Sequence, residues 1–147
     1  MTAPEFRLLP LDQLRVHEEV VEAEVVQLVG ELRSEGTVRE PLWIARGSLV
    51  ILNGHHRYNA LRRMGARLAP AWLLDYDDPE IELGRWGEGP SLTKAEVVER
   101  GLSGRPYPPK TTRHQIRHSL PHHPTPLAEL GVAVAARAGP PSRPSSG

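Results

Sequence analysis

Residues 49–65 constrain the fold of this chain most, because they predict a strand, a tight turn and a short helix in immediate succession. Residues 49–52 are a continuous apolar run, which is typical of a strand buried on both faces. Asn53 and Gly54 form a turn dipeptide, since both residue types tolerate a positive φ. A helical face of apolar residues follows, and Gly65 is a suitable C-terminal stop. We therefore expect the rest of the chain to fold around this strand–turn–helix unit.

The predicted turn places His55, His56 and Arg57 at the N-terminus of a helix. The first backbone N–H groups of a helix have no partner within it, and the helix dipole is positive there. A guanidinium and two imidazoles at such a position favour phosphate binding. The alternative is an exposed helix start at which Arg57 pairs with a nearby carboxylate, and the residues alone leave both readings open.

Several flanking segments predict further strands. Apolar runs at residues 6–9, 41–45 and 69–74 indicate strands, and residues 81–86 alternate between apolar and polar types, as in a half-exposed strand. Together with the helices they favour an α/β (α+β) fold with a small mixed sheet and flanking helices.

Two further helices are predicted. Apolar residues recur at helical spacing over residues 21–32. A capping box of Thr93 and Glu96 begins a second helix that runs to about Leu102, and Gly101 and Gly104 mark its fraying end. We expect its inward face to consist of Ala95, Val98 and Leu102.

Length and composition bound the remaining choices. A chain of 147 residues corresponds to one domain, which we place at residues 5–130, followed by a low-complexity and disordered tail at 131–147. Residues 1–99 carry 11 basic and 17 acidic side chains, whereas residues 100–147 carry 7 and 1, so positive charge gathers in the C-terminal third. The chain has no cysteine, which excludes disulfides and thiolate metal sites. It also shows no leader or membrane-spanning run, so we expect a soluble, cytoplasmic protein without a membrane partner.

A second cationic segment follows a proline-rich stretch. Five consecutive residues that can all donate hydrogen bonds to phosphate are Lys110, Thr111, Thr112, Arg113 and His114. The preceding prolines predict a positioned loop, although an exposed polar loop is the plain alternative.

Glu18 is the candidate base, although its position at the predicted start of the helix over 21–32 also fits a simple role beside the helix dipole. Two anion-binding segments and one carboxylate form an inventory for phosphoryl transfer, in which catalysis is mostly positioning and charge neutralisation.

Other site classes find little support. His114 and His118 have the spacing of two metal ligands on a helix, but the sequence supplies no further zinc ligands, and we predict no protein-held metal site. The chain also contains no phosphate-binding P-loop, dinucleotide fingerprint or nucleophile elbow.

Three segments resemble the ParB/sulfiredoxin superfamily, and most closely its free L-serine kinases, which are ParB-like nuclease-domain proteins. They are residues 10–18 with a His-Glu pair, residues 52–65 with a Gly-His-His-Arg box, and residues 108–114 with the sequence Pro-Pro-Lys-Thr-Thr-Arg-His. The last segment is the most specific, because chromosome-partitioning ParB proteins lack it. The resemblance implies phosphoryl transfer from ADP or ATP to the hydroxyl of free L-serine, giving O-phospho-L-serine.

The resemblance also implies roles for individual residues. Glu18 would be the base, with His56 also catalytic, and Mg²⁺ would accompany the nucleotide. The residues implied to bind nucleotide or phosphate are Asn53, Gly54, His55, His56, Arg57, Lys110, Thr111, Thr112, Arg113 and His114.

Two departures from the family pattern keep alternatives open. Asn53 stands where the family box has an aspartate, which favours a catalytically weak sensor of nucleotides or phosphorylated metabolites, unless Asp75 substitutes. The chain also lacks an inserted region between Trp86 and Thr93. A ParB-type module linked to nucleotide or DNA is the other alternative, but no second helix suited to a DNA groove follows Asp75, so nucleic acid is an unlikely partner.

Overall fold

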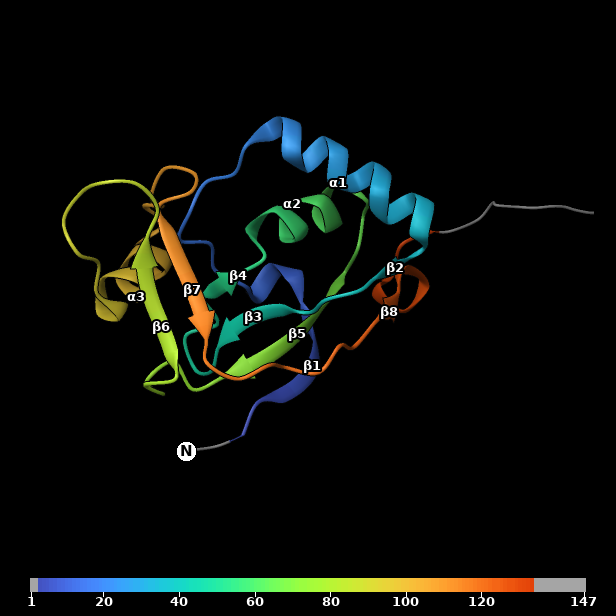
Figure 1. Ribbon diagram of the computed structural model, residues 1–147. Helices are drawn as coiled ribbons and strands as arrows, with labels where there is room; N and C mark the ends of the chain where they lie inside the picture. The colour runs from blue at the N-terminus through green and yellow to red at the C-terminus, as the bar shows by residue number, and fades with distance from the viewer. Residues whose placement is uncertain (1–2, 134–147) are drawn as a thin grey trace, which may run out of the picture.

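The computed structural model describes residues 3–133 and has a mixed four-stranded sheet at its centre (Figure 1). The strands are β1 (Glu5–Pro10), β2 (Thr37–Val38), β3 (Leu42–Ala45), β4 (Ile51–Asn53), β5 (Leu68–Leu74), β6 (Ile81–Arg85), β7 (Thr112–Ile116) and β8 (Thr125–Pro126). The helices are α1 (Glu22–Glu35), α2 (His55–Arg63) and α3 (Lys94–Ser103), with 3₁₀ turns at Leu11–Gln13 and Leu127–Leu130.

The sheet has the strand order β1-β5-β3-β4. β5 is antiparallel to β1 and parallel to β3, and β3 is antiparallel to β4. Two-stranded antiparallel pairs, β2 with β8 and β6 with β7, complete the fold. The predicted mixed sheet with flanking helices is therefore confirmed.

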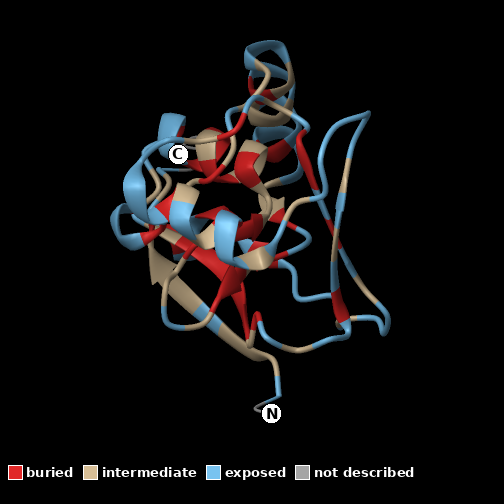
Figure 2. Cartoon of the chain, turned by 90° about the vertical axis from the view of Figure 1, so that its left-hand side faces the viewer, coloured by how far each residue is buried: buried red, intermediate tan, exposed pale blue. Residues whose placement is uncertain are grey.

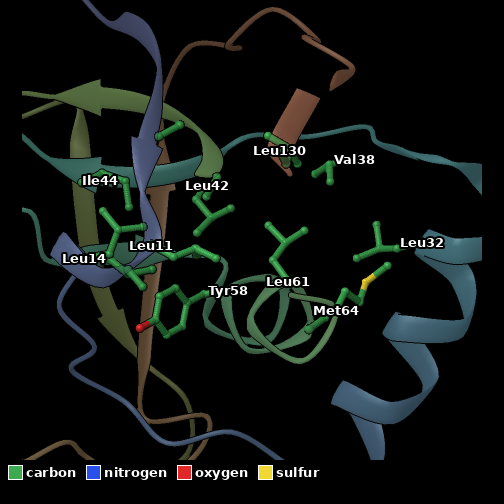
Figure 3. Packing of buried hydrophobic residues seen from close by; sticks show 14 of the residues in the cluster. Leu11, Leu14, Leu32, Val38, Leu42, Ile44, Tyr58, Leu61, Met64 and Leu130 are labelled. Carbon is green, nitrogen blue, oxygen red and sulfur yellow. The ribbon is translucent and has the colours of Figure 1, made fainter. Parts of the chain in front are cut away.

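The sheet is covered on both faces, as the alternation along β5 shows. Ala69, Ala71 and Leu73 belong to the core that the sheet shares with α1 and α2, whereas Trp72 and Leu74 belong to a second core with α3 and β6. Figure 3 shows the first core, where side chains of α2 lie between the sheet and α1. Buried residues accordingly follow the sheet and the inner sides of the helices (Figure 2).

The helix α1 begins at Glu22, later than predicted. Its first turn contains Glu22 and Glu24, and it ends at Gly36 in the left-handed conformation. Glu18 lies in the extended segment before the helix, so its plain role as a helix-start carboxylate is wrong. That segment is fixed instead by pairing between Glu18 and Tyr107.

The helix α3 has the predicted capping box and ends at Gly104, but only Val98 of its predicted inward face packs against the core, where it is half-buried. Val97 and Gly101 are the buried residues, whereas Ala95 and Leu102 are exposed. A Cβ atom at Gly101 would lie 2.6 Å from Val50 Cγ2. Glycine is therefore required for this close approach of the helix to the sheet, and Gly101 is no fraying end.

Two further predicted elements differ in the structure. Leu49 occupies a left-handed turn with φ 62°, so β4 starts only at Ile51 and runs to Asn53. The predicted loop over residues 110–114 covers only residues 110 and 111, because β7 begins at Thr112 and pairs with β6. Of the predicted tail at 131–147, residues 134–147 lie outside the described part of the chain. Within residues 3–133, no helix has the length and apolarity needed to span a bilayer.

Candidate active site

A cavity of about 410 Å³ lies where the end of β4, the start of α2 and the start of β7 meet. Its lining consists of Glu18, Glu24, Leu52, Asn53, Gly54, His55, His56, Trp86, Lys110, Thr112, Arg113 and His114. The structure thus brings together all predicted site residues except Arg57 and Thr111.

The Glu18 carboxylate is held by the backbone at the start of β7. Its Oε1 atom accepts hydrogen bonds from the N–H of Thr111 (3.2 Å), the N–H of Thr112 (2.8 Å) and the Thr112 hydroxyl (2.8 Å). Its Oε2 atom accepts one, from the N–H of Lys110 at 3.0 Å. Lys110 has φ 59°, and a left-handed residue in such a series turns successive N–H groups toward one anion. Oε2 therefore keeps lone-pair capacity for a substrate.

Gly54 controls the entry to α2. Its φ of 110° suits glycine, and a Cβ atom there would lie 2.8 Å from Leu42 Cγ and 3.1 Å from Arg57 Nη2. This tight turn places the first N–H groups of α2, at His55 and His56, beside the cavity, where they have no partner within the helix. The helix start can therefore bind an anion.

Three imidazoles, His17, His55 and His114, pack together beneath the cavity. Ring centroids of His17 lie 4.6 Å from His55 and 5.8 Å from His114. The N–H of His17 donates to His55 Nε2 at 3.2 Å, and His114 Nε2 lies 2.7 Å from the Tyr76 hydroxyl. Burial lowers the pKa of all three, that of His114 to about 3, with His17 adding a smaller effect there. His55 and His114 are therefore neutral at pH 7 and do not supply positive charge to a phosphate.

His56 lies at the rim of the cavity and connects α2 to the start of α1. Its Nε2 atom accepts a hydrogen bond from the N–H of Val21 at 3.1 Å and lies 3.6 Å from Glu24 Oε1. Glu24 Oε2 in turn lies 2.9 Å from Lys110 Nζ. The rim thus links two helices and the segment before β7 through polar contacts.

Arg57 is not among the residues that line the cavity, and its expected role as a phosphate ligand stays a prediction. Its guanidinium donates to the backbone carbonyls of Glu40 and Pro41 and lies 3.4 Å from Asn53 Oδ1. Burial lowers its pKa to about 10, so the side chain is still charged at neutral pH. Arg57 therefore positions the strand–turn–helix unit.

Thr111 contributes its backbone and not its side chain to the site. Its hydroxyl donates to the Pro108 carbonyl at 2.7 Å, while its N–H binds Glu18. The cationic groups on the cavity wall are thus Lys110 and Arg113, both with exposed side chains.

Asp75 does not substitute for the missing aspartate at position 53. It lines a separate cavity, and its carboxylate accepts a hydrogen bond from Arg46 at 2.8 Å. His114 and His118 are not on a helix, and His118 lies 2.6 Å from Glu80 at the surface. Among residues 3–133 no group of three or more His, Cys, Asp or Glu side chains is arranged to hold a metal.

Sequence reasoning missed several residues of the site. His17 carried a signal, since it precedes Glu18 directly. Trp86 is the last residue of the strand predicted over residues 81–86, and its ring lies 4.6 Å from the Arg113 guanidinium carbon. Glu24 gave no signal, because it lies on the polar face of a surface helix.

The fold of this chain is similar to that of solved free serine kinases. A glutamate-to-alanine variant of a free serine kinase in complex with AMP matches with a TM-score of 0.77 at 17% identity, over 88% of this chain and 95% of that one. A glutamate-to-alanine variant in complex with ADP matches with a TM-score of 0.75 at 18% identity, over 88% of this chain and 94% of that one. SbnI from Staphylococcus aureus, truncated at its C-terminus, gives 0.74 at 13%, over 85% and 88%.

Sequence relatives then narrow the resemblance. An ATP-dependent L-serine kinase of Desulfurococcus mucosus is 33% identical over 105 residues, which cover 65% of this chain and 40% of that protein. An ADP-dependent L-serine kinase of Thermococcus kodakarensis is 28% identical over 100 residues (65% and 41%), and a ParB-like protein of Sulfolobus acidocaldarius 36% over 74 (50% and 37%). The chain thus spans less than half the length of these relatives, and no family model matches it. The predicted resemblance to the ParB/sulfiredoxin superfamily and its free L-serine kinases is confirmed.

Proposed function

We propose that the protein transfers a phosphoryl group from ADP or ATP to the hydroxyl of free L-serine, forming O-phospho-L-serine. The observation that carries the proposal is the single cavity in which a held carboxylate, Glu18, faces two cations and the start of α2. Support comes from relatives named as ADP- or ATP-dependent L-serine kinases and from matching structures that hold AMP or ADP. We place this reaction in the cytoplasm.

In this proposal Glu18 Oε2 accepts the proton of the serine hydroxyl. The hydroxyl oxygen forms a bond to the terminal phosphorus of the nucleotide, and the bond from that phosphorus to the bridging oxygen breaks, leaving AMP from ADP or ADP from ATP. Lys110 and Arg113 neutralise charge on the transferred group, and the first N–H groups of α2 bind phosphate oxygens. His55 and His114 act as neutral hydrogen-bonding groups around the phosphates, and His56 and Asn53 line the same cavity.

Mg²⁺ fits this site as an ion that arrives with the nucleotide. Mg²⁺ is commonly held by one or two carboxylates together with phosphate oxygens and water. The cavity contains only Glu18 and Glu24 as carboxylates among the described residues, and both already accept contacts from Lys110 or its neighbours. Phosphate oxygens and water would therefore supply most ligands, and the ion would neutralise phosphate charge. We expect chelation by EDTA to stop phosphoserine formation and added Mg²⁺ to restore it.

The direct test incubates the protein with L-serine, Mg²⁺ and either ADP or ATP, and follows phosphoserine by ³¹P NMR. Formation of phosphoserine together with AMP identifies ADP as the donor, and formation with ADP identifies ATP. Absence of phosphoserine with both donors would overturn the proposal.

Asn53 favours a second candidate, a sensor that binds nucleotide without turnover, because an amide is a poorer Mg²⁺ ligand than the aspartate of the family box. Calorimetry with ADP, combined with the phosphoserine assay, separates the sensor from the kinase. A sensor binds ADP and forms no phosphoserine, whereas a kinase does both. A nucleic-acid-linked module has less support, since α3 is the only α-helix that the described residues contain after β5. Titration with duplex DNA at several salt concentrations tests that reading.

A further inference from the structure

The cavity contains a second carboxylate, Glu24, which the proposed phosphoryl transfer does not use. It comes from the first turn of α1 and shares the cavity with Glu18. Lys110 contacts both: its backbone N–H donates to Glu18 Oε2 at 3.0 Å, and its Nζ atom lies 2.9 Å from Glu24 Oε2. The two carboxylates therefore contact the same residue and line the same cavity.

One oxygen of Glu24 is open to a donor. Oε1 lies 3.6 Å from His56 Nε2, which is beyond hydrogen-bond distance, and no other residue in the range 3–133 donates to it. His56 Nε2 already accepts the N–H of Val21, so the network assigns the ring proton to Nδ1, and Nε2 cannot donate to Glu24. The hydrogen bond from Lys110 lowers the pKa of Glu24, so the group is ionised at neutral pH. An acceptor oxygen with negative charge thus borders the cavity beside the proposed base.

This inference rests on the proposed function, because it concerns how an amino acid acceptor is chosen. When a free amino acid presents its hydroxyl to Glu18, its α-ammonium group needs an anionic partner in the cavity, since an unpaired charge is costly to remove from water. Among the described residues that line the cavity, Glu24 is the remaining carboxylate. We infer that Glu24 binds the α-ammonium group of the acceptor and selects amino acids over hydroxy acids of the same shape.

The test compares two acceptors, L-serine and L-glycerate, which carries a hydroxyl in place of the ammonium group. In Glu24→Gln, kcat/KM for L-serine should fall roughly 10- to 100-fold, mainly through a higher KM, because a charge-assisted hydrogen bond is lost. The value for L-glycerate should stay within about 3-fold, so that the preference for L-serine collapses. Glu24→Asp should restore part of that preference.

A matched control is Glu22→Gln, because Glu22 lies in the same turn of α1 but pairs with Arg63 outside the cavity. Glu22→Gln should leave kcat/KM unchanged for both L-serine and L-glycerate. Two outcomes in Glu24→Gln would overturn the inference: an equal fall in kcat/KM for both acceptors, or weaker ADP binding by calorimetry with an unchanged acceptor preference. Either outcome would mean that Glu24 holds Lys110 for nucleotide binding.

Failure of the proposed function gives a different result. If the wild-type protein phosphorylates neither acceptor, the kinase proposal is wrong, while binding still decides the role of Glu24. Saturation-transfer NMR with ADP present should then detect L-serine and not L-glycerate on the wild type, and neither on Glu24→Gln. Equal L-serine signals for the wild type and this variant would contradict the inference.

Discussion

The two carboxylate oxygens of Glu18 accept different numbers of hydrogen bonds, three at Oε1 and one at Oε2. This difference determines the expected effect of replacing Glu18. Glu18→Gln keeps an amide oxygen for the three donors at Oε1, but the NH₂ group that replaces Oε2 can neither take a proton nor accept the N–H of Lys110. We expect phosphoserine formation to fall roughly 10²- to 10⁴-fold, as for loss of a general base. Initial rates at saturating nucleotide measure this.

The control for Glu18 is Thr112→Val, which removes a hydroxyl that donates to Oε1 and lies 2.9 Å from His17 Nε2, and which leaves the carboxylate in place. Its rate should fall by less than about 10-fold, in line with the loss of one of the four hydrogen bonds to the carboxylate. Nucleotide affinity, measured by calorimetry, should change little in either variant. A Glu18→Gln variant that retained the wild-type rate would remove Glu18 from its proposed role.

Arg57 is a positioning residue, so its replacement should first affect stability. Arg57→Ala leaves the carbonyls of Glu40 and Pro41 without their charged donor, and the free energy of unfolding should fall by about 2 kcal/mol. Urea denaturation measures the change. Arg33→Ala, an exposed arginine on α1, should cost less than about 0.5 kcal/mol. Unchanged stability combined with weaker ADP binding would return Arg57 to the role of a phosphate ligand.

At the scale of elements, two helix glycines should respond in opposite directions to alanine. Gly101→Ala puts a methyl group against Val50, so we expect α3 to shift and the free energy of unfolding to fall by about 1–3 kcal/mol. Gly30 in α1 has nothing within 4 Å of an added Cβ, so Gly30→Ala should gain about 0.5–1 kcal/mol from helix propensity. Thermal denaturation of both variants checks the pair, and a stabilised Gly101→Ala would show that α3 does not touch the sheet as described.

The elements were predictable where their signals are local. The strand–turn–helix unit is encoded within residues 49–65, and the Thr93 capping box lies within four residues, so both were found. Periodicity predicts Leu102 and not Gly101 as an inward residue of α3, whereas the close approach to Val50 requires the glycine. The start of β7 carries no local strand signal, because its partner β6 lies before α3 in the sequence.

The candidate site was predicted in its membership more than in its geometry. The resemblance selected residues of the cavity, but no local pattern tells that the backbone of residues 110–112 holds Glu18, since this contact depends on the left-handed Lys110. Nor does sequence show that Arg57 turns away to the carbonyls of residues 40 and 41. The sequence also overstates the positive charge of the site. Burial lowers the pKa of His55 and His114 and keeps them neutral, and burial is a property of the folded chain.

For the whole molecule, the buried imidazoles predict a stability that depends on pH. His17, His55 and His114 have pKa values below the ordinary 6.5 when folded, so the unfolded chain binds more protons below that pH. Their contribution is fully present above pH 6.5 and is lost as pH falls, for His114 down to about 3. The free energy of unfolding should decrease by roughly 1.4 kcal/mol per pH unit for each histidine that stays neutral.

Urea denaturation between pH 6.5 and 5 isolates this effect, because carboxyl groups ordinarily titrate lower. His114→Gln should reduce the slope of the free energy of unfolding against pH by the contribution of about one proton. His118→Gln, which replaces a surface imidazole, should leave the slope unchanged. A stability that did not vary over this interval would mean that the three rings are hydrated.

The long separation between Glu18 and its backbone donors, 92 to 94 positions along the chain, has a consequence for biosynthesis. All four strands of the central sheet lie before residue 75, so the sheet can assemble on a ribosome that has yet to deliver β7. The nascent protein would then have its central sheet, but Glu18 would lack the backbone donors that hold its carboxylate. During refolding, phosphoserine formation should therefore recover later than the secondary-structure signal in circular dichroism. Activity requires the backbone of residues 110–112 to reach Glu18.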